Sequence, residues 1–233
     1  MEIYGIEKLT LVDYDGHTAC ILFTGGCNFR CGYCHNSSLV ETEKNYNRIP
    51  HDELFQYLKK RKGLLDGVAI TGGEPTLNHD LPDFIKEIKD IGYDVKLDSN
   101  GTNPKMLVRL LDMKLVDYLA MDIKSTPQNY TAVVGKRLSD AVMNNLFESV
   151  DILKNSGIRY EFRTTLIKEY HTEEVMLGIA DWIQGAEKYA MQRFNVSDSC
   201  IDATGLTPVS KEEALRYRDI MSNKLNNIVL RAF

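Results

Sequence analysis

Short apolar runs alternate with amphipathic segments along most of this 233-residue chain, and this alternation constrains its fold more than any other feature. Six of the apolar runs read as strands, at 18–24, 67–71, 94–98, 117–122, 159–167 and 190–196. Apolar residues at helical spacing predict helices at 51–61, 81–91, 104–113, 140–154, 173–183 and 211–225. Strands that alternate with helices form parallel βα units with right-handed crossovers.

Parallel βα units leave two architectures open for this α/β chain. The sheet is either open and doubly wound or a full or partial (β/α) barrel, and six units are too few for the usual eight-fold closure. In both architectures the side chains that do chemistry lie at the carboxyl ends of the strands. We expect a single domain over 1–233, with a core at about 18–198 and a C-terminal helix and tail at 199–233. Gly92 and Gly157 are expected at helix C-caps.

The bulk composition argues against several classes of protein. A net charge of −5 gives no general attraction to nucleic acid or to anionic membranes. No apolar run approaches the roughly 20 residues that a membrane span needs. The first residues have neither the basic nor the apolar region of a signal peptide. We therefore expect a cytoplasmic protein that binds neither nucleic acid nor membranes, and whose five cysteines stay reduced.

Three of the five cysteines lie within eight residues, in the loop after the first predicted strand. Cys27, Cys31 and Cys34 have C-x3-C-x2-C spacing, which lets three thiolates converge on one soft metal centre. A structural zinc site with His35 as its fourth ligand is an alternative. However, His35 directly follows Cys34, and neighbouring side chains rarely reach one tetrahedral ion together.

The two other cysteines do not complete a four-thiolate site. Cys20 falls in the first predicted strand, where we expect it in the core, and Cys200 lies far along the chain. A ferredoxin-type electron carrier would supply four cysteines for each cluster. Three thiolates therefore favour a cubane iron–sulfur cluster in which one iron is open to another ligand.

Polar motifs follow three later strands. Residues 71–75 read TGGEP, 98–102 read DSNGT and 121–125 read MDIKS. The TGGEP motif is also consistent with a simple tight turn, and the DSNGT motif with a turn into a helix capped near Thr102. Asp122 and Lys124 lie two residues apart in a predicted buried strand, where both charges need partners, and this favours a site.

The cysteine spacing, with Tyr33 directly before the last cysteine and TGGEP after the next strand, resembles the radical S-adenosylmethionine (SAM) superfamily. The resemblance implies a partial (β/α)6 barrel. It also implies a [4Fe–4S] cluster that cleaves SAM reductively, with the methionine part of SAM on the open iron. The thiolates that it assigns to the cluster are those of Cys27, Cys31 and Cys34.

The later motifs are similar to those of the glycyl radical enzyme activases, which carry D-[TS]-N-G and D-[LI]-K strand ends in the same order. The resemblance implies that SAM is bound by the cysteine loop, by the strand ends and by a histidine after the fifth strand. The residues that it implies are Tyr33, Cys34, His35, Gly72, Gly73, Glu74, Ser99, Asn100, Asp122, Ile123, Lys124 and His171. A monovalent cation near Asp98 and Asp122 is a further implication.

The segment 11–16, LVDYDG, looks most like the activating proteins of anaerobic ribonucleotide reductase, although Asp15 stands where proline is usual. This resemblance implies a glycyl radical enzyme as partner, flavodoxin or ferredoxin as electron donor, and an anaerobic setting. Two alternatives stay open. One is a small-molecule radical SAM enzyme, such as a 7-carboxy-7-deazaguanine synthase, and the other is a non-catalytic zinc or iron–sulfur binding module.

Overall fold

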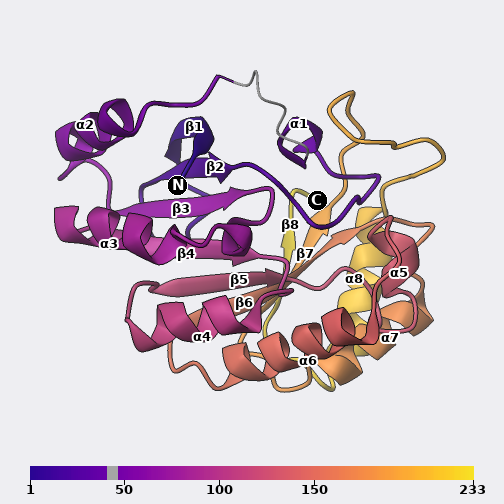
Figure 1. Ribbon diagram of the computed structural model, residues 1–233. Helices are drawn as coiled ribbons and strands as arrows, with labels where there is room; N and C mark the ends of the chain where they lie inside the picture. The colour runs from indigo at the N-terminus through magenta and orange to yellow at the C-terminus, as the bar shows by residue number, and fades with distance from the viewer. Residues whose placement is uncertain (41–46) are drawn as a thin grey trace. The chain divides into compact units, whose positions relative to one another are not determined.

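The computed structural model describes residues 1–40 and 47–233, and strands alternate with helices through these ranges (Figure 1). The strands are β1 (Ile3–Thr10), β2 (Ala19–Thr24), β3 (Gly67–Gly72), β4 (Asp94–Ser99), β5 (Tyr118–Asp122), β6 (Arg159–Leu166), β7 (Tyr189–Arg193) and β8 (Ile228–Arg231). The α-helices are α1 (Ser37–Val40), α2 (His51–Arg61), α3 (Leu81–Ile91), α4 (Pro104–Asp112), α5 (Tyr130–Val133), α6 (Asp140–Lys154), α7 (Glu173–Trp182) and α8 (Lys211–Met221). A 3₁₀ helix, η1, covers Pro75–Leu77.

The six predicted strands correspond to β2 to β7, with ends that agree within three residues. Hydrogen bonds join the eight strands in chain order, with β1 and β8 at the two ends of an open sheet. The pairs β2–β3, β3–β4, β6–β7 and β7–β8 are parallel. The predicted α/β class, built from βα units, is confirmed.

The sequence pattern does not predict β1 or β8. β1 pairs antiparallel with β2, but three successive residues of β1, Glu7 to Leu9, are exposed, so it lacks the regular alternation of a half-buried strand. β8 has four residues, and it pairs parallel to β7 within the segment expected to be a helix and tail. Both strands depend on a neighbour in the sheet, which local sequence cannot reveal.

The predicted helices agree closely with the structure. α2, α3 and α6 have the predicted ends, and α4, α7 and α8 end earlier by one, one and four residues. Gly92 is the C-cap of α3, with a left-handed φ of 95°. The prediction for Gly157 is wrong by two residues, because Asn155 is the C-cap of α6. Asn103 caps α4 through its side chain, next to the expected Thr102.

The chain divides into two compact units. The first comprises Met1–Asn28, Ser38–Ser99 and Asn103–Leu119, and the second comprises Phe29–Ser37, Asn100–Thr102 and Ala120–Phe233. In the first unit, Phe84 of α3 is buried and packs edge-on against Phe55 of α2, with ring centroids 5.6 Å apart. In the second, the fully buried Tyr189 of β7 donates a hydrogen bond of 2.7 Å to the Thr164 hydroxyl of β6.

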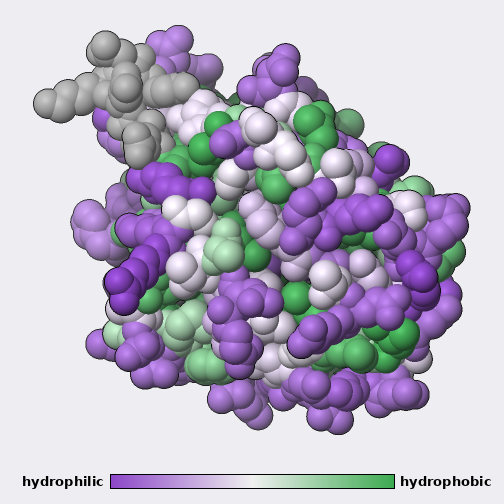
Figure 2. Space-filling view, turned by 90° about the vertical axis from the view of Figure 1, so that its right-hand side faces the viewer, coloured by the Kyte–Doolittle hydropathy of each residue, from purple (hydrophilic) through white to green (hydrophobic). Residues whose placement is uncertain are grey.

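No helix in the described ranges is long and apolar enough to cross a bilayer. On the face drawn in Figure 2, hydrophilic residues predominate and apolar residues form small, separate patches. Scattered apolar side chains of this kind are normal on a protein surface.

Candidate active site

The cysteine loop of the second unit contributes Cys31 and Cys34. The two residues share a turn, because the Cys34 N–H donates to the Cys31 carbonyl over 3.0 Å. Cys31 is buried and Cys34 is half-buried. Burial raises the pKa of the Cys34 thiol, and a backbone hydrogen bond from Asn36 opposes this rise.

Cys27 belongs to the first unit, where the end of α1 supports its backbone. The Gly26 and Cys27 N–H groups donate to the carbonyls of Leu39 and Val40 over 2.7 and 3.2 Å. None of the three motif cysteines is in a disulfide, and thiolates are the soft ligands that iron–sulfur clusters take. Within the described ranges no three His, Cys, Asp or Glu side chains are arranged as a ready metal site. The donor chemistry fits a [4Fe–4S] cluster, and the ligand set stays a prediction.

Glu74 is the buried carboxylate of the TGGEP motif. Its Oε1 accepts hydrogen bonds from the Thr76 N–H over 3.1 Å, from the Ser99 hydroxyl over 2.9 Å, and from the Thr76 hydroxyl. The two bonds from Thr76 cap η1, and the bond from Ser99 joins the ends of β3 and β4. The structure therefore brings two predicted site residues, Glu74 and Ser99, into contact.

The two glycines before Glu74 let the backbone pass close to the cysteine loop within the first unit. A Cβ on Gly73 would overlap the Gly26 carbonyl oxygen, and Gly72 has a left-handed φ of 121°. The Glu74 N–H donates to that same Gly26 carbonyl over 2.7 Å. The glycines predicted for SAM binding are thus also required by packing.

Asn100 accepts hydrogen bonds that hold a turn. Its Oδ1 accepts from the N–H and the hydroxyl of Thr102, over 3.0 and 2.7 Å. α6 supports the same turn, because Asn145 donates to the Thr102 carbonyl and Ser149 to the Gly101 carbonyl. The reading of this motif as a turn that leads into a helix is therefore also correct.

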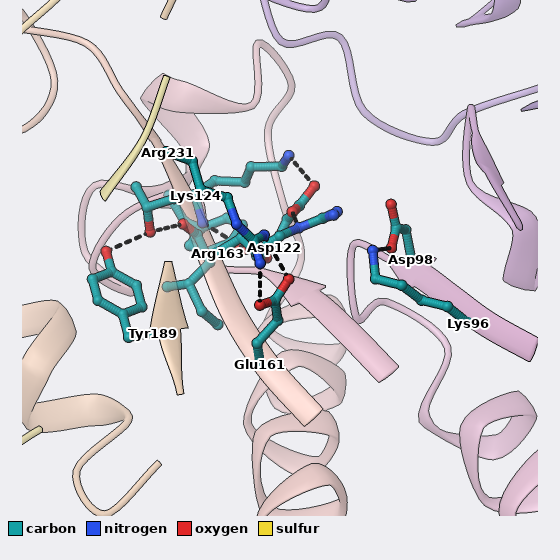
Figure 3. Close-up of polar contacts among 11 residues, drawn as sticks. Lys96, Asp98, Asp122, Lys124, Glu161, Arg163, Tyr189 and Arg231 are labelled. Carbon is teal, nitrogen blue, oxygen red and sulfur yellow. Dashed lines mark hydrogen bonds and ion pairs between the residues drawn. The ribbon is translucent and has the colours of Figure 1, made fainter. Parts of the chain in front are cut away.

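Asp122, at the end of β5, lies between two cations of the second unit (Figure 3). Its Oδ2 accepts from Lys124 Nζ over 2.8 Å and its Oδ1 from Arg163 Nε over 2.9 Å. Burial would raise the pKa of Asp122, but the charges of Arg163 and Lys124 outweigh burial and hold that pKa well below its usual range. Burial would likewise lower the pKa of Lys124, but Asp122 keeps it well above its usual range. The site therefore holds fixed charges near neutral pH.

Arg163 is a site residue that sequence reasoning did not select. It lies in the predicted strand 159–167, and its partner Asp122 is 41 residues away along the chain. A buried arginine in a strand is the only sequence signal, because buried arginines need acidic partners. The Lys124 Nζ atom lies 6.0 Å from the centre of the Tyr33 ring. This cation–π contact links the cysteine loop to the charged residues around Asp122.

His171 is fully buried, and both of its ring nitrogens have partners. Nδ1 accepts from the Ile167 N–H over 2.9 Å, so Nε2 carries the proton and donates to the Lys124 carbonyl over 3.0 Å. Burial lowers the pKa of His171 to about 4. The imidazole is therefore neutral, and it fixes the backbone that carries Lys124. The adjacent Ile123 is also buried and donates its N–H to the Arg163 carbonyl.

Two other predicted site residues, His35 and Asp98, have described contacts with residues outside the predicted set. His35 Nε2 lies 2.5 Å from the Asn195 carbonyl, and the His35 ring stacks on Phe194. Asp98 accepts from Lys96 Nζ over 2.7 Å (Figure 3). Asp98 and Asp122 thus each have a basic partner, so neither carboxylate needs a metal ion for charge balance. The monovalent cation stays a prediction.

A second buried carboxylate lies on β6. Glu161 is fully buried and accepts a bidentate pair from Arg231 of β8, over 2.7 and 2.8 Å (Figure 3). Lys188 Nζ lies 3.4 Å from the same carboxylate. Because side chains alternate along a strand, Glu161 and Arg163 share one face of β6. The pair of Glu161 and Arg231 is also not predicted from the sequence, since the partners are 70 residues apart.

Residues 21–183 match the Radical SAM superfamily model. A protein of Methanocaldococcus jannaschii, provisionally named a glycyl-radical enzyme activating enzyme, is 31% identical over 232 residues, which are 98% of this chain and 95% of the relative. Among solved structures, Streptococcus suis SuiB has a TM-score of 0.66 at 14% identity. The match covers 91% of this chain but only 48% of SuiB. A domain of pyruvate-formate lyase-activating enzyme from Bacteroides vulgatus has a TM-score of 0.56 at 16% identity, covering 70% of this chain and 98% of the domain. At these identities the two structures establish a likeness of fold.

Proposed function

Because this chain belongs to the radical SAM superfamily, we propose that it activates a glycyl radical enzyme, with anaerobic ribonucleotide reductase as the first candidate. It would work in the cytoplasm and receive its electron from flavodoxin or ferredoxin. The similarity to a relative of nearly the same length supports the activase type. The partner and the donor rest on the motif resemblance alone.

The observation that carries this proposal is the position of the polar residues at the ends of successive strands. Glu74 follows β3, Ser99 ends β4, Asp122 ends β5 and His171 follows β6. The carboxyl ends of strands in βα folds are where ligands bind. A structural zinc or iron–sulfur module would have no need for charged and hydrogen-bonded groups at four consecutive strand ends.

Cys27, Cys31 and Cys34 would hold the [4Fe–4S] cluster, and Glu74 with the strand-end groups would bind SAM. When bound, the two cofactors supply the one-electron chemistry that removes a hydrogen atom from a glycine Cα. The chain itself binds and orients. Thr76 and Ser99 hold the Glu74 carboxylate by hydrogen bonds, and this carboxylate would receive a cationic group such as the SAM ammonium. Asp122 fixes the side-chain ammonium group of Lys124, and His171 fixes the Lys124 backbone.

The test is anaerobic. The reconstituted protein receives SAM, dithionite and ribonucleotide reductase, and we expect 5′-deoxyadenosine together with the EPR doublet of a glycyl radical. Cys34→Ala is the control, and it should give neither signal because three thiolates are the minimum for the cluster. Pyruvate formate-lyase serves as a second candidate partner.

Two other outcomes would change the proposal. 5′-Deoxyadenosine without a radical on either partner would contradict the activase and point to a small-molecule radical SAM enzyme. A colourless protein that retains zinc after reconstitution would contradict the cluster and favour the non-catalytic module.

A further inference from the structure

The segment 194–206, which follows β7, lies against the cysteine loop within the second unit. The Asp202 N–H donates to the Gly32 carbonyl over 2.8 Å. A Cβ on Gly32 would lie 2.6 Å from the Asp202 carbonyl oxygen, so the two backbones touch and leave room for glycine only. We call this segment the strap.

Aromatic contacts fix the other end of the strap. Phe194 stacks on the His35 ring with centroids 5.8 Å apart, and it meets the Tyr33 ring edge-on at 6.3 Å. The Asn195 carbonyl lies 2.5 Å from His35 Nε2. Contacts at residues 194, 195 and 202 therefore hold the intervening strap residues beside the cysteine loop.

These contacts place Cys200 next to Cys34. The Cys200 Sγ lies 3.8 Å from the Tyr33 carbonyl oxygen, and Tyr33 immediately precedes Cys34. Across a trans peptide that oxygen is about 3 Å from the next Cα, so Cys200 Sγ lies within about 7 Å of the Cys34 Cα. A disulfide requires the Cys34 and Cys200 Cα atoms to lie within about 7 Å of each other, and rotation of the two side chains would then bring the sulfurs together.

The chemical state of both thiols permits a bond between them. Both are free and half-buried, so a small oxidant can reach them. Cys20, by contrast, is fully buried in β2, where burial raises its pKa to about 12, and it is inert.

We propose that Cys34 and Cys200 form a reversible disulfide in the cluster-free protein. The oxidant is a low-molecular-weight disulfide. One cysteine thiolate attacks a sulfur of that disulfide and releases one small thiol, and the second cysteine then displaces the other. Cys34 and Cys200 are oxidised by two electrons in total, the small disulfide is reduced to two thiols, and the two cysteine protons go to those thiols.

The disulfide withdraws a predicted cluster ligand and ties the strap to the cysteine loop. It would protect the Cys34 sulfur from irreversible oxidation while the cluster is absent. Reduction would then have to precede cluster assembly. This consequence rests on the proposed function, whereas the bond itself does not.

The first experiment maps the bond in the full, cluster-free chain. The protein is incubated with oxidised glutathione, alkylated, and digested with trypsin without reductant. Cleavage after Arg30, Lys44, Arg193 and Lys211 puts Cys31 and Cys34 on one peptide and Cys200 on another. We expect these two peptides to be linked, with fragmentation placing the bond at Cys34.

The neighbouring C-x2-C pair provides the competing product. A bond between Cys31 and Cys34, with Cys200 alkylated, would overturn the proposal. Alkylation of all three of Cys31, Cys34 and Cys200 would overturn it too. Cys200→Ser must abolish the linked peptide. The matched variant Cys20→Ala must leave it unchanged, because Cys20 is buried in β2.

Iron loading tests separately whether the disulfide must be reduced before the cluster assembles. The oxidised wild-type protein should lose most of its capacity to bind iron and sulfide, and dithiothreitol should restore it. Cys200→Ser should load equally well with and without dithiothreitol. Full loading with the Cys34–Cys200 bond still intact would contradict Cys34 as a cluster ligand, while the mapped bond would stand.

Discussion

Gly73 lies where two backbone segments of the first unit touch, so its missing side chain has a structural cause. The Gly26 carbonyl occupies the space that a Cβ would take, and it accepts the Glu74 N–H over 2.7 Å. A methyl group there must move the TGGEP turn or the start of the cysteine loop. Because the obstacle is backbone, it cannot yield by changing a rotamer.

We therefore predict that Gly73→Ala lowers the free energy of unfolding by about 1–3 kcal/mol. Urea denaturation of the two proteins measures the difference. Gly5→Ala is the matched control, because its Cβ would meet the Phe23 side chain at an ordinary 3.5 Å. Equal midpoints for Gly73→Ala and Gly5→Ala would show that the close approach does not constrain residue 73.

His171 provides a pH test at the residue scale. An unfolded histidine takes up a proton near its ordinary pKa of 6.5, whereas folded His171 does so only near 4. Between these values the unfolded state binds more protons, so stability falls as the pH decreases. The full shift corresponds to about 3 kcal/mol.

Urea denaturation at pH 7.5 and at pH 4.5 should therefore show a larger loss of stability in the wild type than in His171→Asn. The lowered pKa of Asp122 acts in a different range, because that group protonates only below its usual 3.8. Parallel pH profiles for wild type and His171→Asn would mean that the imidazole is not buried as a neutral group.

Single residues also show where sequence reasoning ends. Asp122 and Lys124 are identifiable because charges two apart in a strand call for partners, and they do contact each other. Their third partner, Arg163, comes from another strand, and Glu74 meets Ser99 across 25 residues. Such pairings depend on strand order and register, which a local pattern does not contain. Where these groups stand relative to SAM stays a prediction.

At the scale of elements, β8 is held by more than its hydrogen bonds to β7. Arg231 reaches Glu161 of β6, whose side chain is fully buried, and Lys188 is a second cation there. Removal of one partner leaves a charge in a low-dielectric environment, which costs more than the pair itself contributes.

We predict that Arg231→Met lowers the unfolding free energy by about 2–4 kcal/mol. Adding Glu161→Gln should recover part of this loss, since the buried carboxylate that has lost its arginine is then replaced by a neutral amide. Arg218→Met in α8 is the control, because the Arg218–Asp219 pair is exposed and contributes about 0.5 kcal/mol or less. A double variant no more stable than Arg231→Met would place the effect in packing rather than in charge.

Elements with strong periodicity are the ones that sequence predicts well. α3, for example, places Phe84, Ile85 and Ile88 on one buried face, and Gly92 is its C-cap as expected. β1 and β8 are missed because their pairing with β2 and β7 is what makes them strands. The strap is missed for a similar reason, since its contacts are with residues about 160 positions earlier.

At the scale of the whole molecule, the predicted SAM-binding residues run from Tyr33 to His171, so they extend over most of the chain rather than one loop. A ligand that binds such a set recognises the folded protein and not the unfolded one. By linkage, binding then adds directly to the free energy of unfolding. SAM should therefore stabilise the entire protein.

We predict that SAM at a hundred times its dissociation constant raises the stability of the cluster-loaded protein by about 2.7 kcal/mol, measured anaerobically by thermal denaturation. In Cys34→Ala the same SAM concentration should do much less, because the methionine part of SAM would lose the open iron. ATP, which carries the adenosine but no methionine, is the control ligand and should leave both midpoints nearly unchanged. An equal SAM shift in Cys34→Ala would show that SAM binds without the cluster, and the strand-end groups alone would then account for its affinity.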